Sequence, residues 1–373
     1  MKRILSKEGV TVLTVSLFLW SCQKNLNESP LTGKQEMQKF GAANDLEERR
    51  EQKDFVQVNV VGDNNEYNPA HIDTNLVNAW GIAFPASGPA WVTSFGKRVS
   101  AIYNADGSSA RPAVTIPSHA ATTGGHPTGI VANATTDFKL PNGNPARFIF
   151  AQADGMISGW NGGNAAIKMA DDSSGEVYLG LAMATDGGNN FLYAANFSQG
   201  KIDVFDKNMT KVSRRFRDPY LPHGYVPLNI QQIDGKLFVM YGQPGTGADV
   251  ISPRNGFVDI YNPDGRFVKR FISQGKLNAP WGITKAPNGF FGSHSKSKDI
   301  FLVGNFGDGH INAYDAEGEF QEQLRAQGKP ITIERLWGIS FAPATSTVVD
   351  HNLLFFAAGP DGEKHGLFGF IKK

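Results

Sequence analysis

The sequence predicts an all-β protein, a six-bladed β-propeller whose blades are four-stranded antiparallel sheets. Three observations carry this prediction: a motif that recurs six times, strand and turn signals that recur with it, and an additional strand before the first repeat. The composition agrees, because 42 Gly and 20 Pro among 373 residues suit short strands and tight turns rather than long helices. This length would hold two average domains, but large all-β folds often exceed about 200 residues as one unit.

The first 22 residues have the pattern of an export signal. Three cations lie among the first seven residues, an apolar run of 11 residues extends from Val10 to Trp20, and Ser21 directly precedes Cys22. The run is too short to span a membrane as a helix, which needs about 20 apolar residues. Cys22 is the only cysteine in the sequence, so an intrachain disulfide is excluded.

The segment Leu19-Trp20-Ser21-Cys22 resembles the bacterial lipobox, in which the cysteine is acylated and becomes the first mature residue, although Trp20 departs from the usual small or aliphatic residue. The resemblance implies a lipoprotein signal peptide over 1–22, lipid attachment at Cys22 and a place in the cell envelope. Gln23 favours the outer membrane by the same analogy. The alternatives are an ordinary signal peptide, or a short anchor helix with an incidental cysteine. Residues 23–54 are polar without apolar periodicity, which indicates a flexible tether.

The propeller is expected over residues 55–373, where one motif recurs. Its six copies are Asn78-Ala-Trp-Gly-Ile82, His126-Pro-Thr-Gly-Ile130, Tyr178-Leu-Gly-Leu-Ala182, Val226-Pro-Leu-Asn-Ile230, Ala279-Pro-Trp-Gly-Ile283 and Arg335-Leu-Trp-Gly-Ile339. The marker positions are Gly81, Gly129, Gly180, Asn229, Gly282 and Gly338, which lie 48, 51, 49, 53 and 56 residues apart. Periods of this length are typical of propeller blades.

Each copy of the motif is followed by the signals of three further strands. A β-rich segment such as Lys236-Leu-Phe-Val-Met-Tyr241 comes first, and an alternating apolar and polar segment such as Gly256-Phe-Val-Asp-Ile-Tyr261 comes next. Hairpin turns such as Asn262-Pro-Asp-Gly265 then lead into a fourth strand. The last repeat ends with its third strand at Gly366–Ile371. The unassigned strand Phe55–Val61 is therefore expected to complete the last blade and close the ring, which removes the exposed sheet edges.

The Trp-Gly-Ile starts and the segment Asn305-Phe-Gly-Asp-Gly-His-Ile-Asn-Ala-Tyr-Asp315 resemble an uncharacterised bacterial six-bladed propeller family with no assigned activity, over nearly all of residues 55–373. The Pro-x-Gly-Ile blade start is more distantly similar to NHL repeats and to the SMP-30 or gluconolactonase type of propeller. That second resemblance is an analogy of fold alone. The 36 Lys and Arg balance 35 Asp and Glu without forming a basic stripe, so a nucleic-acid partner is not expected.

Candidate ligand-binding residues lie where first strands begin and second strands end, because these positions meet at one end of a propeller. The longest loop insertions belong to the same end. The candidates are Asn78, His126, Asp154, Asn196, His223, Asn229 and Asn305. The side-chain oxygen atoms of the Asn and Asp candidates predict a polar mouth on the axis that would suit a hard cation such as Ca²⁺, whereas His126 and His223 could be metal ligands or acid-base groups. The alternative for each Asn or Asp is a role in shaping turns, and the alternative for each His is a solvated loop position.

The motif carries tryptophan at the same position in three copies, as Trp80, Trp281 and Trp337. These side chains could form an aromatic cage, or they could pack between neighbouring blades. No nucleophile elbow, Cys-His pair, zinc-binding helix or phosphate loop is present, which weakens the case for an enzyme without excluding one. The first hypothesis is thus a lipid-anchored binding module that takes a small molecule, glycan or protein. The second is a metal-dependent lactonase or hydrolase that uses Asp154 and Asn196. The third is a purely structural lipoprotein.

Overall fold

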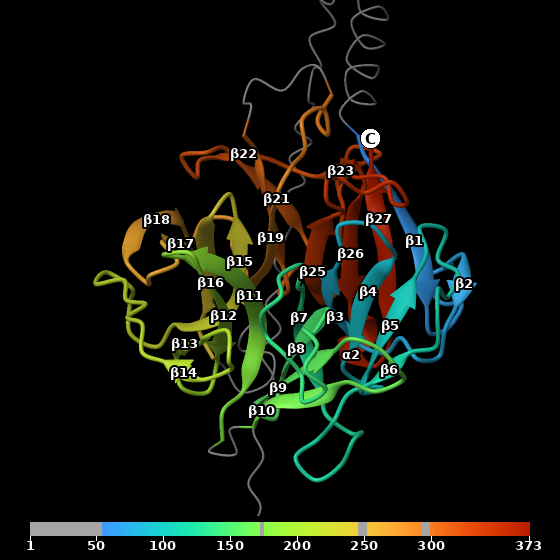
Figure 1. The fold of residues 1–373 in the computed structure, drawn as a ribbon. Helices are drawn as coiled ribbons and strands as arrows, with labels where there is room; N and C mark the ends of the chain where they lie inside the picture. Colours follow the sequence, from blue (N-terminus) through green and yellow to red (C-terminus); the bar gives the residue numbers. More distant parts are fainter. Residues whose placement is uncertain (1–53, 172–174, 245–251, 293–298) are drawn as a thin grey trace, which may run out of the picture. The chain divides into compact units, whose positions relative to one another are not determined.

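The computed structural model describes residues 54–171, 175–244, 252–292 and 299–373. Six sheets, each with four antiparallel strands, surround one axis, as Figure 1 shows, and the predicted six-bladed β-propeller is confirmed. The predicted signal peptide, Cys22 and all of the tether except Asp54 lie outside the described residues, so these predictions stay untested. Within the described ranges, no helix has the length and apolar character that crossing a membrane requires.

Each blade runs outward from the axis in chain order. Blades 1 to 3 are β3 (Ala79–Ala83), β4 (Ala90–Ser94), β5 (Val99–Tyr103), β6 (Val114–Thr115); β7 (Pro127–Ala132), β8 (Phe148–Gln152), β9 (Met156–Trp160), β10 (Ile167–Asp171); and β11 (Tyr178–Asp186), β12 (Asn189–Asn196), β13 (Lys201–Phe205), β14 (Lys211–Val212). Blades 4 and 5 are β15 (Val226–Ile233), β16 (Lys236–Gly242), β17 (Phe257–Tyr261), β18 (Phe267–Ser273); and β19 (Pro280–Lys285), β20 (Phe301–Asn305), β21 (Ile311–Tyr314), β22 (Phe320–Gln323). The first strands therefore form the inner ring.

Blade 6 joins the two ends of the propeller. It consists of β25 (Leu336–Phe341), β26 (Leu354–Ala358), β27 (Leu367–Lys372) and β1 (Val56–Gly62), with β2 (His71–Ile72) as a fifth strand. The small hairpin β23 (Arg325–Ala326) and β24 (Lys329–Pro330) precedes this blade, and the short turn α2 (Pro360–Glu363) follows β26. Because β1 pairs antiparallel with β27, from Val56 opposite Lys372 to Gly62 opposite Leu367, the predicted ring closure is confirmed.

Glycines in the first strands let neighbouring blades approach along the axis. A Cβ atom on Gly81 would lie 2.7 Å from the carbonyl oxygen of Thr128, and one on Gly129 would lie 2.7 Å from the backbone nitrogen of Leu181. Real Cβ atoms do not approach so closely, so these positions exclude larger residues. Asn229 replaces glycine in blade 4, and its Nδ2 donates to the Trp281 carbonyl oxygen at 2.7 Å. The repeated position therefore holds the inner ring together.

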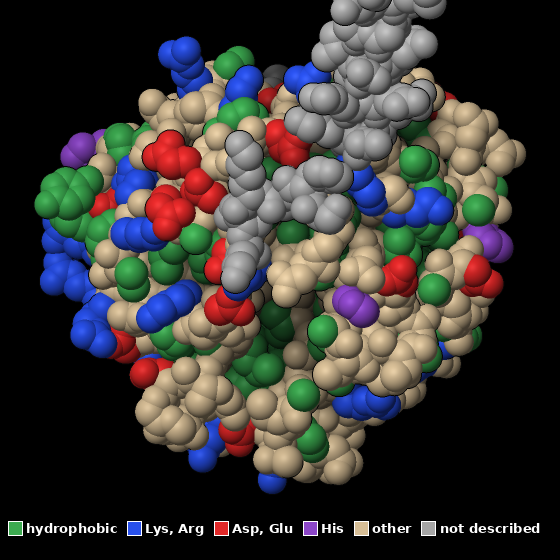
Figure 2. All heavy atoms as spheres, turned by 90° about the horizontal axis from the view of Figure 1, so that it is seen from above, with side chains coloured by type: hydrophobic (Ala, Val, Ile, Leu, Met, Phe, Trp, Pro, Cys, Tyr) green, Lys and Arg blue, Asp and Glu red, His purple; other side chains and the backbone are tan. Residues whose placement is uncertain are grey.

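The two ends of the propeller differ in what they carry. We call the end where first strands begin and second strands end the loop face, since it bears the connections 116–126 and 213–225. The chain terminates at the opposite face, in Lys373 after β27 (Figure 1). Figure 2 shows this opposite face, with a hollow near its middle and hydrophobic side chains inside it. All the candidates predicted from the sequence belong to the loop face.

Candidate binding site

The mouth of the propeller on the loop face is filled by aromatic side chains. Trp80 and Trp337 stack with ring centroids 3.5 Å apart, and Trp281 meets both rings edge to face. All three are buried, together with Leu228 from blade 4 and Phe306 from blade 5. Because the cluster joins blade 1 to blade 4 across the ring, it lies on the axis. The expected polar mouth is therefore wrong, and the tryptophans pack across the axis as well as between neighbours.

A local irregularity aims these tryptophans at the axis. The pairing register shifts between Ala79 and Ile82, between Pro280 and Gly282, and between Leu336 and Ile339. Such bulges interrupt the alternation of a strand and redirect the side chain within them. The indole therefore leaves the sheet face on which simple alternation would place it.

The two asparagines near the starts of first strands, Asn78 before β3 and Asn229 within β15, support the inner ring. Asn78 is buried, and its Oδ1 accepts a hydrogen bond from the Trp337 indole nitrogen at 3.0 Å. Its Nδ2 donates to Glu363 at 2.9 Å. Asn229 bonds to the backbone of blade 5, as described above, and its Oδ1 accepts from the Ile230 nitrogen at 2.8 Å. In the described structure, both side-chain amides thus donate and accept hydrogen bonds with groups of the propeller itself.

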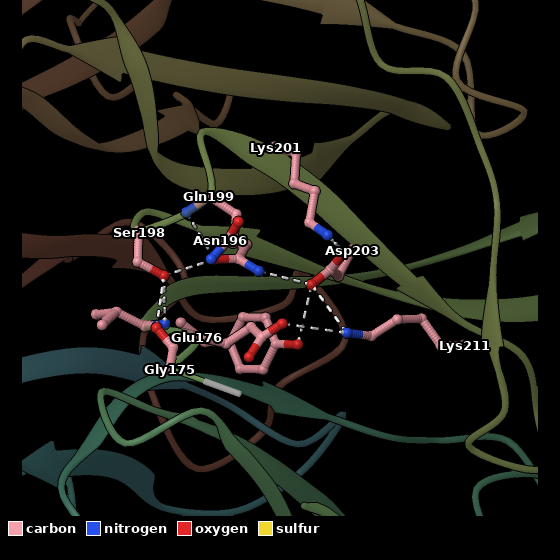
Figure 3. A network of polar contacts seen from close by, with 10 residues as sticks. Gly175, Glu176, Asn196, Ser198, Gln199, Lys201, Asp203 and Lys211 are labelled. Atoms are coloured by element: carbon pink, nitrogen blue, oxygen red, sulfur yellow. Dashed lines mark hydrogen bonds and ion pairs between the residues drawn. The ribbon is translucent and has the colours of Figure 1, made fainter. Parts of the chain in front are cut away.

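Asn196 belongs to a polar network in blade 3, drawn in Figure 3. Its Nδ2 donates to the Asp203 carboxylate at 2.7 Å, while its Oδ1 accepts from Ser198 Oγ and from the Gln199 nitrogen, both at 3.1 Å. Lys201 and Lys211 each place an ammonium group 3.2 Å from the same carboxylate. The network fixes the turn between β12 and β13.

Asp203 keeps its charge despite its burial. Burial alone would raise the pKa of Asp203, but the hydrogen bond from Asn196 and the ammonium groups of Lys211 and Lys201 outweigh it and lower the pKa below its ordinary value. The carboxylate is therefore an ionised, fully occupied acceptor. It has no evident capacity left for a metal ion.

The remaining polar candidates lie in blades 2 and 5. Asn305 donates to the Lys276 carbonyl oxygen at 2.7 Å, while its own Oδ1 is buried without a partner among the described residues. His126 packs against Phe95, with ring centroids 4.8 Å apart. Burial raises the pKa of Asp154, whose backbone carbonyl oxygen lies 2.6 Å from His119 Nε2. Asn305 and His126 thus contact residues outside the strands of their own blades.

The structure does not gather the seven candidates into one site. They come from blades 1 to 5, and most have local partners. In the described ranges, no group of three or more His, Cys, Asp or Glu side chains is arranged to hold a metal ion. The Ca²⁺ at the axial mouth stays a prediction.

His223, the last candidate, lines a pocket between blades 3 and 4. The pocket has a volume of about 250 Å³ and lies between the start of β13 and the blade connection 213–227. Its lining is Gly200, Lys201, Ile202, Phe216, Arg217, Asp218, Leu221, Pro222, His223, Gly224, Tyr225, Pro227 and Tyr241. Aromatic and cationic side chains therefore meet in one concave site.

A buried charged group fixes the wall of this pocket. Asp218 in the connection and Asp259 in β17 both pair with the guanidinium of Arg270 in β18, and neither carboxylate is exposed. The Arg270 guanidinium also lies over the Phe257 ring, 4.3 Å from its centroid. Pairing makes the burial of these charges tolerable and ties the connection to blade 4.

Asp259 connects the buried charges to the pocket through two tyrosines. Burial raises the pKa of Asp259 to about 7, against a hydrogen bond from Tyr261 that favours the ionised form. The Tyr261 hydroxyl lies 3.4 Å from Asp259 Oδ2 and 3.0 Å from the hydroxyl of Tyr241, which lines the pocket. One guanidinium faces two carboxylates here, so protonation of Asp259 relieves an excess of negative charge.

Asp259 and Asp218 were missed as site residues. A signal for Asp259 exists in the sequence, since this acid lies between Phe257 and Tyr261 on the apolar side of an alternating strand. Asp218 gives no such signal, because its partner Arg270 is 52 residues away and only the folded connection brings them together.

The comparisons with known proteins place the chain among viral relatives. No family model matches it. Of solved structures, a catalytically inactive virginiamycin B lyase from Staphylococcus aureus with quinupristin has a TM-score of 0.50 at 14% identity, covering 86% of this chain and 99% of the lyase, which is a likeness of fold.

Two proteins of Acanthamoeba polyphaga mimivirus are similar in sequence. "Uncharacterized protein R648" is 32% identical over an alignment of 338 positions that covers 85% of this chain and 80% of the viral protein. "Uncharacterized protein L690" is 31% identical, over 85% of this chain and 86% of its own length. The expected restriction of the family to bacteria is therefore not supported. The chain belongs to the family of propeller proteins that these two mimivirus proteins represent.

Proposed function

We propose that the protein is a ligand-binding module that recognises a small molecule in the pocket between β13 and the connection 213–227. A β-propeller is consistent with such a role, because its rigid blades carry variable loops on one face. The observation that carries the proposal is the pocket itself. It is open at the loop face, and the Asp218, Arg270 and Asp259 group fixes one wall.

The tryptophan cluster on the axis favours the pocket between blades 3 and 4 as the binding site, rather than the axis itself. A ligand on the axis would have to displace Trp80, Trp281 and Trp337, all of which are at least 93% buried. The lateral pocket needs no such rearrangement, and preformed sites avoid the cost of ordering.

Two fluorinated probes of equal shape test the proposal by ¹⁹F NMR: 4-fluorobenzoate and 4-fluorobenzamide. We expect line broadening of at least one probe with the wild type and its loss in Leu221→Trp, which fills the pocket. Val348→Trp is the matched control, because Val348 is 54% exposed and does not line the pocket. If neither probe broadens, or if the broadening survives Leu221→Trp, the proposal fails.

For the N-terminal region, we propose export and lipid attachment at Cys22, which would hold the propeller at the cell envelope, in the outer membrane. The support is the sequence pattern of residues 1–22 alone. Mass spectrometry of the mature N-terminal peptide from cells is the test. We expect an acylated Cys22 in the membrane fraction and a soluble, unacylated protein for Cys22→Ser, whereas an unmodified Cys22 in the wild type would refute the anchor.

A further inference from the structure

The rim of the pocket between blades 3 and 4 presents positive charge. Lys201, Arg217 and His223 all line it, and Arg217 and His223 are exposed. Neither of these two makes a hydrogen bond or ion pair with any described residue. Lys201 is 51% exposed and lies 3.2 Å from Asp203. Arg217 and His223 are thus available for a ligand, with the Lys201 ammonium group on the same rim.

The carboxylates near the pocket are not available to compete for these cations. Asp218 lines the pocket, but its carboxylate is unexposed and pairs with Arg270. The Asp203 carboxylate accepts hydrogen bonds from Tyr178 at 3.0 Å, Asn196 at 2.7 Å and Lys211 at 3.2 Å. The accessible charge in the pocket is therefore positive, which favours an anion.

The walls of the pocket suit a flat apolar body. Phe216 packs against Tyr261 with ring centroids 5.2 Å apart, and Tyr225 meets Phe257 edge to face at 4.7 Å. These contacts hold both lining aromatics in place, so a ring can pack on them without ordering them first. A volume of about 250 Å³ limits the ligand to roughly one ring with substituents.

We infer that the ligand is a small organic anion, a carboxylate carried on a flat apolar ring, bound by Arg217 and His223 with its ring between Phe216 and Tyr225. This inference rests on the proposed function, since it names the ligand class of the same pocket. Arg217 is the main determinant, because a guanidinium binds a carboxylate through two parallel hydrogen bonds. His223 adds a ring N–H that can donate a further hydrogen bond to the same carboxylate.

The same two probes separate the inference from the proposed function. Titrations in 50 mM NaCl should show 4-fluorobenzoate binding about tenfold more tightly than 4-fluorobenzamide, a difference typical of a charge-assisted contact. Equal affinity for the two probes overturns the inference while the pocket remains a binding site. Failure of both probes to bind overturns the inference together with the proposed function.

Substitution of Arg217 is the second test of the inferred ligand class. We expect Arg217→Gln to weaken 4-fluorobenzoate binding about fivefold and to leave 4-fluorobenzamide unchanged. Arg215→Gln is the matched control, since Arg215 is an exposed arginine of the same connection that does not line the pocket, and it should change neither affinity. Unchanged benzoate affinity in Arg217→Gln, or equal losses in the two variants, contradicts the assignment.

Discussion

Asp259 shows how one buried side chain links the stability of the propeller to pH. It shares the Arg270 guanidinium with Asp218, and burial raises its pKa to about 7. The folded state therefore binds the proton more tightly than the unfolded chain, whose aspartates titrate near 4. Its contribution to stability is fully present below about pH 4 and is lost as the pH rises towards 7.

Asp259→Asn should remove this dependence. The amide oxygen can still accept from Arg270, but the side chain no longer titrates, so the fall in unfolding free energy between pH 4 and 7 becomes shallower than in the wild type. Urea unfolding, followed by tryptophan fluorescence at several pH values, measures the unfolding free energy of both proteins. Asp264→Asn is the control. The hydrogen bond from the Arg266 backbone is the main cause that lowers the pKa of Asp264, so this carboxyl group is already ionised between pH 4 and 7. A slope identical to wild type would contradict the role of Asp259.

Asn196 illustrates a candidate whose contacts are structural. Asn196→Ala removes the hydrogen bond to the buried Asp203 and leaves the Gln199 nitrogen without its acceptor, so we expect a loss of about 1–3 kcal/mol in unfolding free energy. Asn208→Ala, at an exposed turn, should change stability by less than about 0.5 kcal/mol. Equal midpoints in urea for the two variants would argue against the structural role.

At the scale of the element, the first strands tolerate almost no added volume. Gly180 in β11 faces Asn229 of β15, and a Cβ atom on it would lie 2.6 Å from the Asn229 Cα. Gly180→Ala therefore forces the two inner strands apart, and we expect a loss of roughly 3 kcal/mol. Gly162→Ala, where a Cβ would meet nothing within 4 Å, is the matched control. Equal shifts of the thermal unfolding midpoint in the two variants would contradict the close approach of β11 and β15.

The elements themselves were largely predictable, whereas their irregular parts were not. The four strands per blade follow from alternation and turn residues, which are local signals. The register shifts that aim Trp80 and Trp337 at the axis lie between the first and second strands of their own blades, and simple alternation of apolar and polar residues does not indicate them. The connection 213–227 likewise takes its form from the contact of Asp218 with Arg270, across 52 residues of sequence.

For the whole molecule, ring closure by β1 makes a sharp prediction. A chain beginning at residue 54 should unfold at the same temperature as the full chain, because the propeller is complete. A chain beginning at residue 63 lacks β1, whose Val60 and Val61 are buried, and leaves the edge of β27 unpaired. We expect it to aggregate or to lose cooperative unfolding in calorimetry. Normal unfolding of the shorter chain would show that the ring does not need this strand.

The number of blades and the closing strand were predictable because the motif recurs with a period near 50 residues, and five of its six copies carry glycine at the marker position. The binding site was predictable only as a region. Seven residues were expected to share a mouth on the axis, but tryptophans fill that mouth, and only His223 lines the pocket between blades 3 and 4. Whether the axial mouth or the pocket between blades 3 and 4 is open depends on packing between different blades, and the sequence of a single repeat does not show this packing.

The central claim is that this pocket binds a small ligand. A crystal structure of the full chain with 4-fluorobenzoate tests it most directly, since the ligand is seen in place. The account predicts the carboxylate against Arg217 and the ring between Phe216 and Tyr225. Ligand density on the axis among Trp80, Trp281 and Trp337, with the pocket between blades 3 and 4 unchanged, would contradict it.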